Sequence, residues 1–111
     1  MKGWKTLCST ADVDAAIESS NQRSVVLFKH STRCSISSMA WNRIININED
    51  ESESIGFYYL DLIQHRDVSN YIAERLSVNH ESPQVIVVKN GEATLDISHF
   101  EIQPKEILDN I

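Results

Sequence analysis

The sequence has few cysteines and no long apolar runs, and each shortage excludes a class of protein. Small secreted domains need a framework of disulfides, and two cysteines in 111 residues make a poor one. No apolar run approaches the roughly 18 to 20 residues of a membrane-spanning helix, and the first residues lack the apolar stretch of a signal peptide. We therefore expect a soluble cytoplasmic protein with no membrane partner.

Basic residues are also in short supply. Sixteen acidic against ten basic residues give a net charge of -6, which disfavours binding to phosphate backbones, so nucleic acid is not an expected partner. The densest run of charge, residues 49–53, is interpreted as a solvated loop without chemistry. Four histidines, at positions 30, 65, 80 and 99, lack the spacing of metal ligands. We interpret them as surface or loop residues and expect no metal.

What remains is enough to build one folded unit. A hydrophobic fraction of 41% can fill one core, and a single domain spanning residues 1–111 is the natural expectation. Apolar patterns predict strands and helices in alternation. The strands are expected at residues 4–7, 24–30, 55–62, 84–89 and 92–97, and the helices at 10–20, from 34 onward, 67–76 and from 104 onward. The run 24–30 lacks alternation, as a central strand buried on both faces requires.

Local signals support several boundaries of these elements. Ser9 is the expected N-cap of the first helix, with Asp12 three residues later in a capping box. The dipeptide at 90–91, Asn-Gly, predicts a type I′ hairpin between the last two strands. Pro104 suits the first turn of the last helix. That helix is expected to present Ile107, Leu108 and Ile111 as its apolar face.

The order of these elements defines a fold class. It is β-α-β-α-β-α-β-β-α, in which a hairpin closes an otherwise alternating pattern. We predict an α/β protein of the thioredoxin-like fold, with a mixed central sheet flanked by helices on both faces.

Cys34 lies where the predicted central strand gives way to the second helix. The unpaired N–H groups of a first helical turn carry partial positive charge and favour a thiolate, which is the nucleophilic form of cysteine. Arg33 adds a permanent positive charge, and Lys29 or His30 adds more if its side chain reaches the loop. We interpret Cys34 as a reactive nucleophile, with an inert buried cysteine as the alternative.

Ser37 stands where a Cys-x-x-Cys enzyme has its second cysteine. A serine hydroxyl cannot attack a mixed disulfide, so resolution needs an outside thiol or Cys8. We assign Ser37 to the catalytic site as a hydrogen-bond donor to the thiolate of Cys34, and an ordinary first-turn serine is the equal alternative. Cys8 lies at an element boundary and is interpreted as structural.

The segment 28–37, Phe-Lys-His-Ser-Thr-Arg-Cys-Ser-Ile-Ser, resembles the active-site segment of the bacilliredoxins of the YtxJ type. These are monothiol thioredoxin-like proteins of bacillithiol-producing bacteria, and they typically read Lys-His-Ser, a threonine-containing turn and Cys-Pro-Ile-Ser. Ser35 stands where proline is usual. The order Ser82-Pro83-Gln84 also matches the family. In thioredoxin-like proteins a cis proline at this place faces the active cysteine, and the backbone of the preceding residue pairs with the bound partner.

The resemblance implies a thiol–disulfide oxidoreductase that removes bacillithiol from S-bacillithiolated client proteins. Cys34 would attack the bacillithiol sulfur, free the client thiol and carry the bacillithiol until another thiol removes it. Bacillithiol is then a co-substrate, and no tightly bound cofactor is expected. Substrate contacts are assigned to Arg33, Ser35, Ser82 and Pro83.

Two alternatives remain. A glutaredoxin-like monothiol protein using glutathione is the nearer one, but residues 97–101 lack the glycine pair and acidic residue with which glutaredoxins hold glutathione. The other is a redox-inactive binding module that uses the groove at Cys34 and Pro83 to hold a partner peptide.

Overall fold

The computed structural model describes residues 3–47 and 55–111, so the prediction of a solvated loop at 49–53 lies outside the described residues. Within them, strands β1 (Trp4–Thr6), β2 (Ser24–His30), β3 (Ile55–Asp61), β4 (Gln84–Lys89) and β5 (Glu92–Ser98) form one sheet in the order β1-β3-β2-β4-β5. The first three run parallel, and the last two are antiparallel to their neighbours. The sheet is therefore mixed, as predicted, with β2 at its centre.

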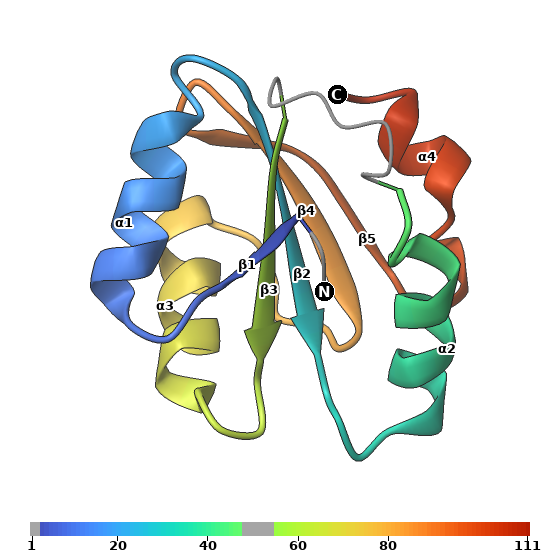
Figure 1. Cartoon of the computed structure of the whole chain (residues 1–111). Coiled ribbons are helices and arrows are strands. Elements are labelled where there is room, and N and C mark those ends of the chain that lie inside the picture. Colours follow the sequence, from blue (N-terminus) through green and yellow to red (C-terminus); the bar gives the residue numbers. More distant parts are fainter. Residues whose placement is uncertain (1–2, 48–54) are drawn as a thin grey trace.

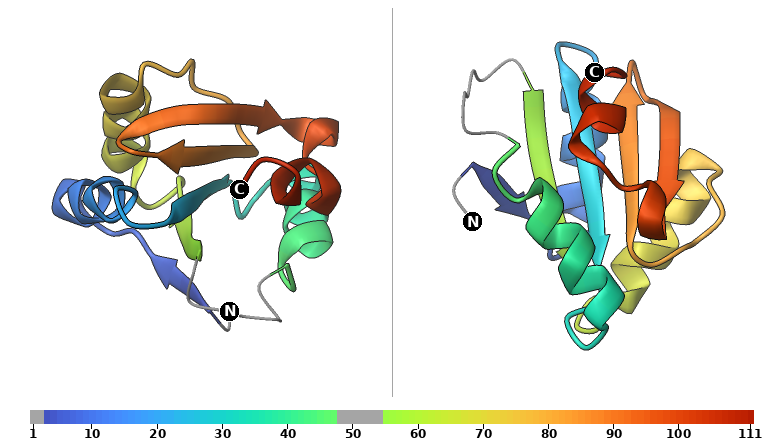
Figure 2. Two further views of the ribbon diagram at one scale, coloured as in Figure 1. Left: turned by 90° about the horizontal axis from the view of Figure 1, so that it is seen from above. Right: turned by 90° about the vertical axis from the view of Figure 1, so that its right-hand side faces the viewer.

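Helices cover both faces of this sheet (Figures 1 and 2). Helices α1 (Thr10–Ser19) and α3 (Arg66–Leu76) lie on one face, and α2 (Ser35–Ile44) and α4 (Pro104–Leu108) lie on the other. The predicted α/β class, with a thioredoxin-like order of elements, is confirmed. A short 3₁₀ helix, η1 (His99–Glu101), follows β5 and was not predicted. No described helix combines the length and the apolar character needed to cross a membrane.

Each face of the sheet has its own apolar cluster, and β2 contributes to both because successive side chains of a strand point to opposite faces. Val25 and Leu27 belong to the cluster under α1 and α3, whereas Val26 and Phe28 belong to the cluster under α2 and α4. Every residue of β2 after Ser24 is buried, as predicted for a central strand.

The predicted N-cap and hairpin turn are present, but the predicted capping box is not closed. The Ser9 hydroxyl accepts a hydrogen bond from the Asp12 N–H at 3.1 Å, whereas the Asp12 carboxylate accepts from the N–H of Cys8 rather than from that of Ser9. In the hairpin, Asn90 and Gly91 have φ angles of 51° and 80°, the two positive values that a type I′ turn requires.

Three details differ from the sequence-based expectations. Leu108 is 50% exposed, so Ile107 is the buried residue of α4 and Leu108 does not belong to its apolar face. The helical spacing of apolar residues after Cys34 predicts a second helix that includes Ile47, but α2 ends at Ile44, and Ile47 packs against the apolar cluster from beyond it. His30 is buried within the sheet rather than placed on the surface, because it is the last residue of the central strand.

Candidate active site at Cys34

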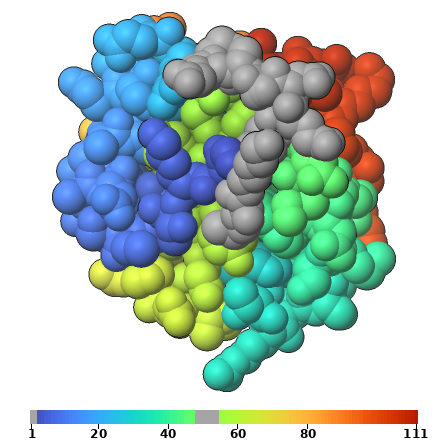
Figure 3. Space-filling model, viewed as in Figure 1, coloured from blue at the N-terminus to red at the C-terminus, as the bar shows by residue number. Residues whose placement is uncertain are grey.

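Cys34 is the N-cap of α2. Its backbone is extended, with φ of −111° and ψ of 122°, its carbonyl accepts the Ser38 N–H at 3.0 Å, and its side chain makes no capping hydrogen bond. A second bond, from the Cys34 N–H to the Ser31 carbonyl, closes the turn before the helix. Cys34 is half-buried, and it lies at the start of a helix whose first N–H groups have no intrahelical acceptor. Figure 3 shows the segment between β2 and α2 projecting from the lower edge of the molecule.

The hydroxyl of Ser37 is fully buried and engaged away from the thiol. Its oxygen accepts the Ser31 N–H at 3.0 Å and lies 2.6 Å from Nδ1 of His30. Since the oxygen already accepts from Ser31, its own hydrogen is available to His30. The predicted bond from Ser37 to Cys34 is not among the contacts of the described residues. Ser37 instead ties the first turn of α2 to the loop and to the end of β2.

His30 lies in an aromatic cluster under α2. Its ring stacks on Phe28 at 5.6 Å and also lies near the rings of Trp41 and Tyr59. Burial lowers the pKa of His30, and the carboxylate of Asp61 opposes this only in part. A neutral imidazole can accept the hydroxyl hydrogen of Ser37 at Nδ1. His30 therefore does not supply the positive charge near Cys34 that the sequence suggested.

Lys29 points to the opposite face of the sheet. It is fully buried, and its Nζ lies 3.2 Å from the Ser69 carbonyl and 3.3 Å from Nδ1 of His80. Desolvation lowers the pKa of Lys29 to about 8. Lys29 therefore does not meet the condition for adding charge at Cys34, because alternation along β2 turns its side chain toward α3 and away from the loop.

The residues predicted to contact substrate lie on both sides of Cys34. Arg33 and Ser35 are exposed, and neither side chain forms a hydrogen bond or ion pair with another described residue. The Ser82–Pro83 peptide bond is cis. Because Gln84 pairs with Lys29, Pro83 lies beside the end of β2 that leads to Cys34.

The hydroxyl of Ser82 is buried and has no hydrogen-bond partner among the described residues. A contact from Ser82 to a bound chain would therefore come from its backbone. The carbonyl of Pro83 accepts the N–H of His99 at 3.2 Å, which attaches η1 to this side of the site.

Cys8 is exposed and precedes α1, which covers the opposite face of the sheet from α2 (Figure 1). Cys34 and Cys8 are thus associated with helices on different faces. A role for Cys8 in resolving a mixed disulfide stays a prediction.

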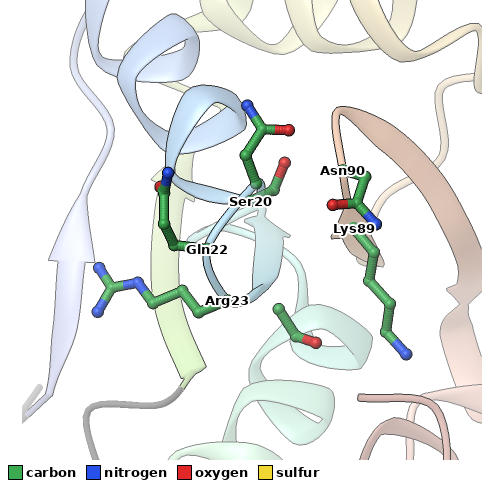
Figure 4. A pocket seen from close by; sticks show the side chains of 7 residues that line it. Ser20, Gln22, Arg23, Lys89 and Asn90 are labelled. Atoms are coloured by element: carbon green, nitrogen blue, oxygen red, sulfur yellow. The ribbon is translucent and has the colours of Figure 1, made fainter.

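An open, polar pocket of about 210 Å³ lies at the other end of the sheet (Figure 4). Ser20, Arg23 and Ser24 line it at the start of β2, and Lys89 and Asn90 line it at the end of β4. Cys34 follows the opposite end of β2, so this pocket is not part of the site. No three His, Cys, Asp or Glu side chains within residues 3–47 and 55–111 gather as metal ligands.

Sequence reasoning missed the contacts of Lys29, His30 and His80. The available signal was two polar residues at the end of an otherwise apolar strand that had to be buried on both faces. Buried polar groups require partners. The sequence could indicate that such partners exist but not which residues they are.

The fold and the site together define a class: a thioredoxin-fold protein with one cysteine at the start of the helix after the central strand. Comparison with known proteins narrows this class. The family model of the monothiol bacilliredoxin BrxC matches residues 5–107. The chain belongs to the monothiol bacilliredoxin family, as the segment 28–37 indicated, and is a thiol–disulfide oxidoreductase by family and fold.

Solved structures agree with this assignment. One, described as an oxidoreductase with a thioredoxin fold, shares 31% identity at a TM-score of 0.85, over 97% of this chain and 93% of its own. Thioredoxin from Fasciola hepatica superimposes with a TM-score of 0.74 and 16% identity, over 95% of this chain and 93% of its own. Mitochondrial thioredoxin 3 from Saccharomyces cerevisiae superimposes with a TM-score of 0.74 and 15% identity, over 97% of this chain and 92% of its own. The two thioredoxins are similar in fold alone.

Proposed function

We propose that the protein removes bacillithiol from mixed disulfides with client proteins, and that Cys34 is the nucleophile. The observation that carries the proposal is the placement of the Cys34 sulfur at the start of α2 without a capping bond. A thiolate at this position lies near the positive end of the helix dipole, and the exposed guanidinium of Arg33 adjoins it in the chain.

The reaction has two exchanges. The Cys34 thiolate attacks the bacillithiol sulfur of the mixed disulfide, the sulfur–sulfur bond breaks, and the client cysteine leaves as a thiolate. An outside thiol then attacks the bacillithiol sulfur on Cys34, forms a new disulfide with it and releases the Cys34 thiolate. Bacillithiol is a co-substrate in this scheme, and no tightly bound cofactor takes part. A reducing cytoplasm suits a protein that must keep Cys34 free between turnovers.

The burial of Ser37 supports an outside thiol in the second exchange. Its hydroxyl is bonded to His30 and Ser31, and serine offers no sulfur to attack the bound bacillithiol. Arg33 and Ser35, the residues on either side of Cys34, are exposed, which supports attack on the bound bacillithiol from solvent.

The test is intact mass spectrometry of the wild type, Cys34→Ala and Cys8→Ala, each mixed with a bacillithiol-modified client protein. A glutathione-modified client is run alongside. We expect bacillithiol to move to Cys34 and free the client, with poor transfer of glutathione and no transfer to Cys34→Ala. If Cys34 stays unmodified while the client still binds, the chain is a binding module instead. Equal transfer of glutathione would favour the glutaredoxin-like alternative.

A further inference from the structure

Lys29 is a buried cation with no anion beside it among residues 3–47 and 55–111. The described residues offer its ammonium group no carboxylate, and its contacts are the Ser69 carbonyl and Nδ1 of His80. Taking an ammonium out of water without an anion costs free energy, and an apolar side chain of similar length would avoid that cost. The pKa of Lys29, lowered to about 8 by burial, reflects the same cost. Stability alone does not account for a lysine at this position.

Two hydrogen-bonding groups, the ammonium group of Lys29 and the hydroxyl of Ser69, lie beside the same ring nitrogen of His80, Nδ1. The hydroxyl of Ser69 lies 3.2 Å from Nδ1, beside the ammonium group of Lys29 at 3.3 Å. A ring nitrogen that accepts hydrogen bonds carries no proton. Burial, followed by the charges of Lys29 on β2 and Arg66 on α3, lowers the pKa of His80, against the opposing carboxylate of Glu81. The bond between Lys29 and His80 therefore requires a neutral imidazole.

His80 belongs to the segment that leads from α3 to Pro83, which we call the proline segment, residues 79–83. Its other anchor is the buried side chain of Gln84, whose Nε2 donates to the Asn79 carbonyl at 3.0 Å and whose Oε1 accepts from the Glu81 N–H at 3.3 Å. Gln84 lies opposite Lys29 in the register of β2 and β4. The proline segment is therefore held from two neighbouring strands at once.

We propose that Lys29 is a positioning residue for exchange with peptide and protein disulfides, because through His80 it aligns the proline segment with the strand that ends at Cys34. The inference rests on the proposed function and deepens it: the resemblance to thioredoxin-like proteins implies that a bound chain pairs with the backbone of Ser82, before the cis bond to Pro83, and Lys29 fixes where that backbone lies. Small disulfides that make no such pairing do not depend on Lys29.

Two probes separate these cases. The first is a short peptide whose single cysteine carries thionitrobenzoate as a mixed disulfide, and the second is dithiobis(nitrobenzoate), which has no peptide backbone. In each reaction the Cys34 thiolate attacks a disulfide sulfur, a new mixed disulfide forms and the coloured thionitrobenzoate thiolate leaves. All variants carry Cys8→Ala, so that Cys34 is the thiol that reacts.

Lys29→Met is expected to slow the peptide reaction about tenfold, as small misplacements of a reacting partner do, and to change the small-probe reaction by less than about twofold. Its melting temperature should be at least that of the wild type, because an unpaired buried charge is removed. His80→Leu should likewise slow the peptide reaction and leave the small-probe reaction nearly unchanged. His80→Asn places an acceptor oxygen near the position of Nδ1, so its peptide rate should return to that of the protein with His80. Lys89→Met, on β4 at the far end of the sheet, is the matched control.

The pH dependence gives a readout that a purely structural role would not change. Protonation of His80 places a second charge beside Lys29 and breaks their bond, while Arg66 also disfavours that charge and Glu81 favours it. Because the pKa of His80 is lowered, the ratio of peptide rate to small-probe rate should fall in acid, with its midpoint at a pH below 6.5, the ordinary pKa of histidine. His80→Asn should remove this fall.

Two results would overturn the inference, and they can be told apart. If Lys29→Met changes both reactions by the same factor, or changes neither, Lys29 does not position a bound chain, and the proposed function stands. If Cys34 reacts with neither probe in the wild type, the proposed function is wrong and the inference falls with it. Neither probe contains bacillithiol, so the outcome does not depend on which small thiol the protein uses.

Discussion

Removing the hydroxyl of Ser37 should destabilise the whole fold. In Ser37→Ala the Ser31 N–H and Nδ1 of His30 both lose their partner, and the helix start loses its connection to β2. A buried polar group left without a partner costs about 1–3 kcal/mol. His30 is buried and Ser31 is half-buried, so we expect the free energy of unfolding to fall by about 3 kcal/mol in total.

Urea denaturation at pH 7 measures this loss of free energy. In thermal unfolding, the same loss should lower the melting temperature of a chain of this length by about 10 °C. Ser38→Ala is the matched control, because Ser38 is the next residue of α2, is half-buried and has no side-chain hydrogen bond with another described residue. It should change the free energy of unfolding by less than about 0.5 kcal/mol. If the two variants lose the same amount, the hydroxyl of Ser37 does not hold the helix start, and the contacts assigned to it are wrong.

Three further predictions concern other contacts. Between pH 8 and 10.5 the free energy of unfolding of the wild type should rise relative to that of Lys29→Met. The reason is that lysine in the unfolded chain keeps its proton up to pH 10.5, whereas buried Lys29 loses it at about pH 8. Urea denaturation across this range measures the difference, and a constant difference would contradict the prediction. Arg43 donates to the carbonyls of Ile102 and His99 at 2.8 and 3.1 Å, so Arg43→Met should cost about 2 kcal/mol in thermal unfolding, and an unchanged melting temperature would show those bonds to be dispensable. Gly91→Ala meets no atom within 4 Å, so its cost should be the conformational one alone, about 1 kcal/mol at a φ of 80°, and a loss above about 3 kcal/mol would mean that the turn has rearranged.

The sequence predicted those parts of the fold that depend on neighbouring residues. The Asn90–Gly91 turn, the Ser9 cap and the uniform burial of β2 follow from local conformational preference and from apolar pattern, and all were confirmed. The start of α2 at Cys34 was predicted in the same way, from the change of period after the strand.

The polar contacts of the site could not be predicted, because their partners lie far away along the chain. Lys29 bonds to residues 40 and 51 positions later, and nothing in its own surroundings names them. The short helix η1 was missed for a different reason. Three residues, beginning with His99 at a positive φ of 53°, are too few to show a period.

The alternating contacts of Lys29 and His30 have a consequence for the specificity of folding. The segment from Val25 to Phe28 is apolar on both faces, so a slip of one residue against β3 or β4 would still bury apolar side chains. The same slip would turn His30 toward α3 and Lys29 toward the aromatic rings under α2, where each loses the contacts that satisfy it. The apolar residues of β2 tolerate several registers against β3 and β4. Lys29 and His30 favour the native register, because in a misaligned sheet both would be buried without hydrogen-bond partners.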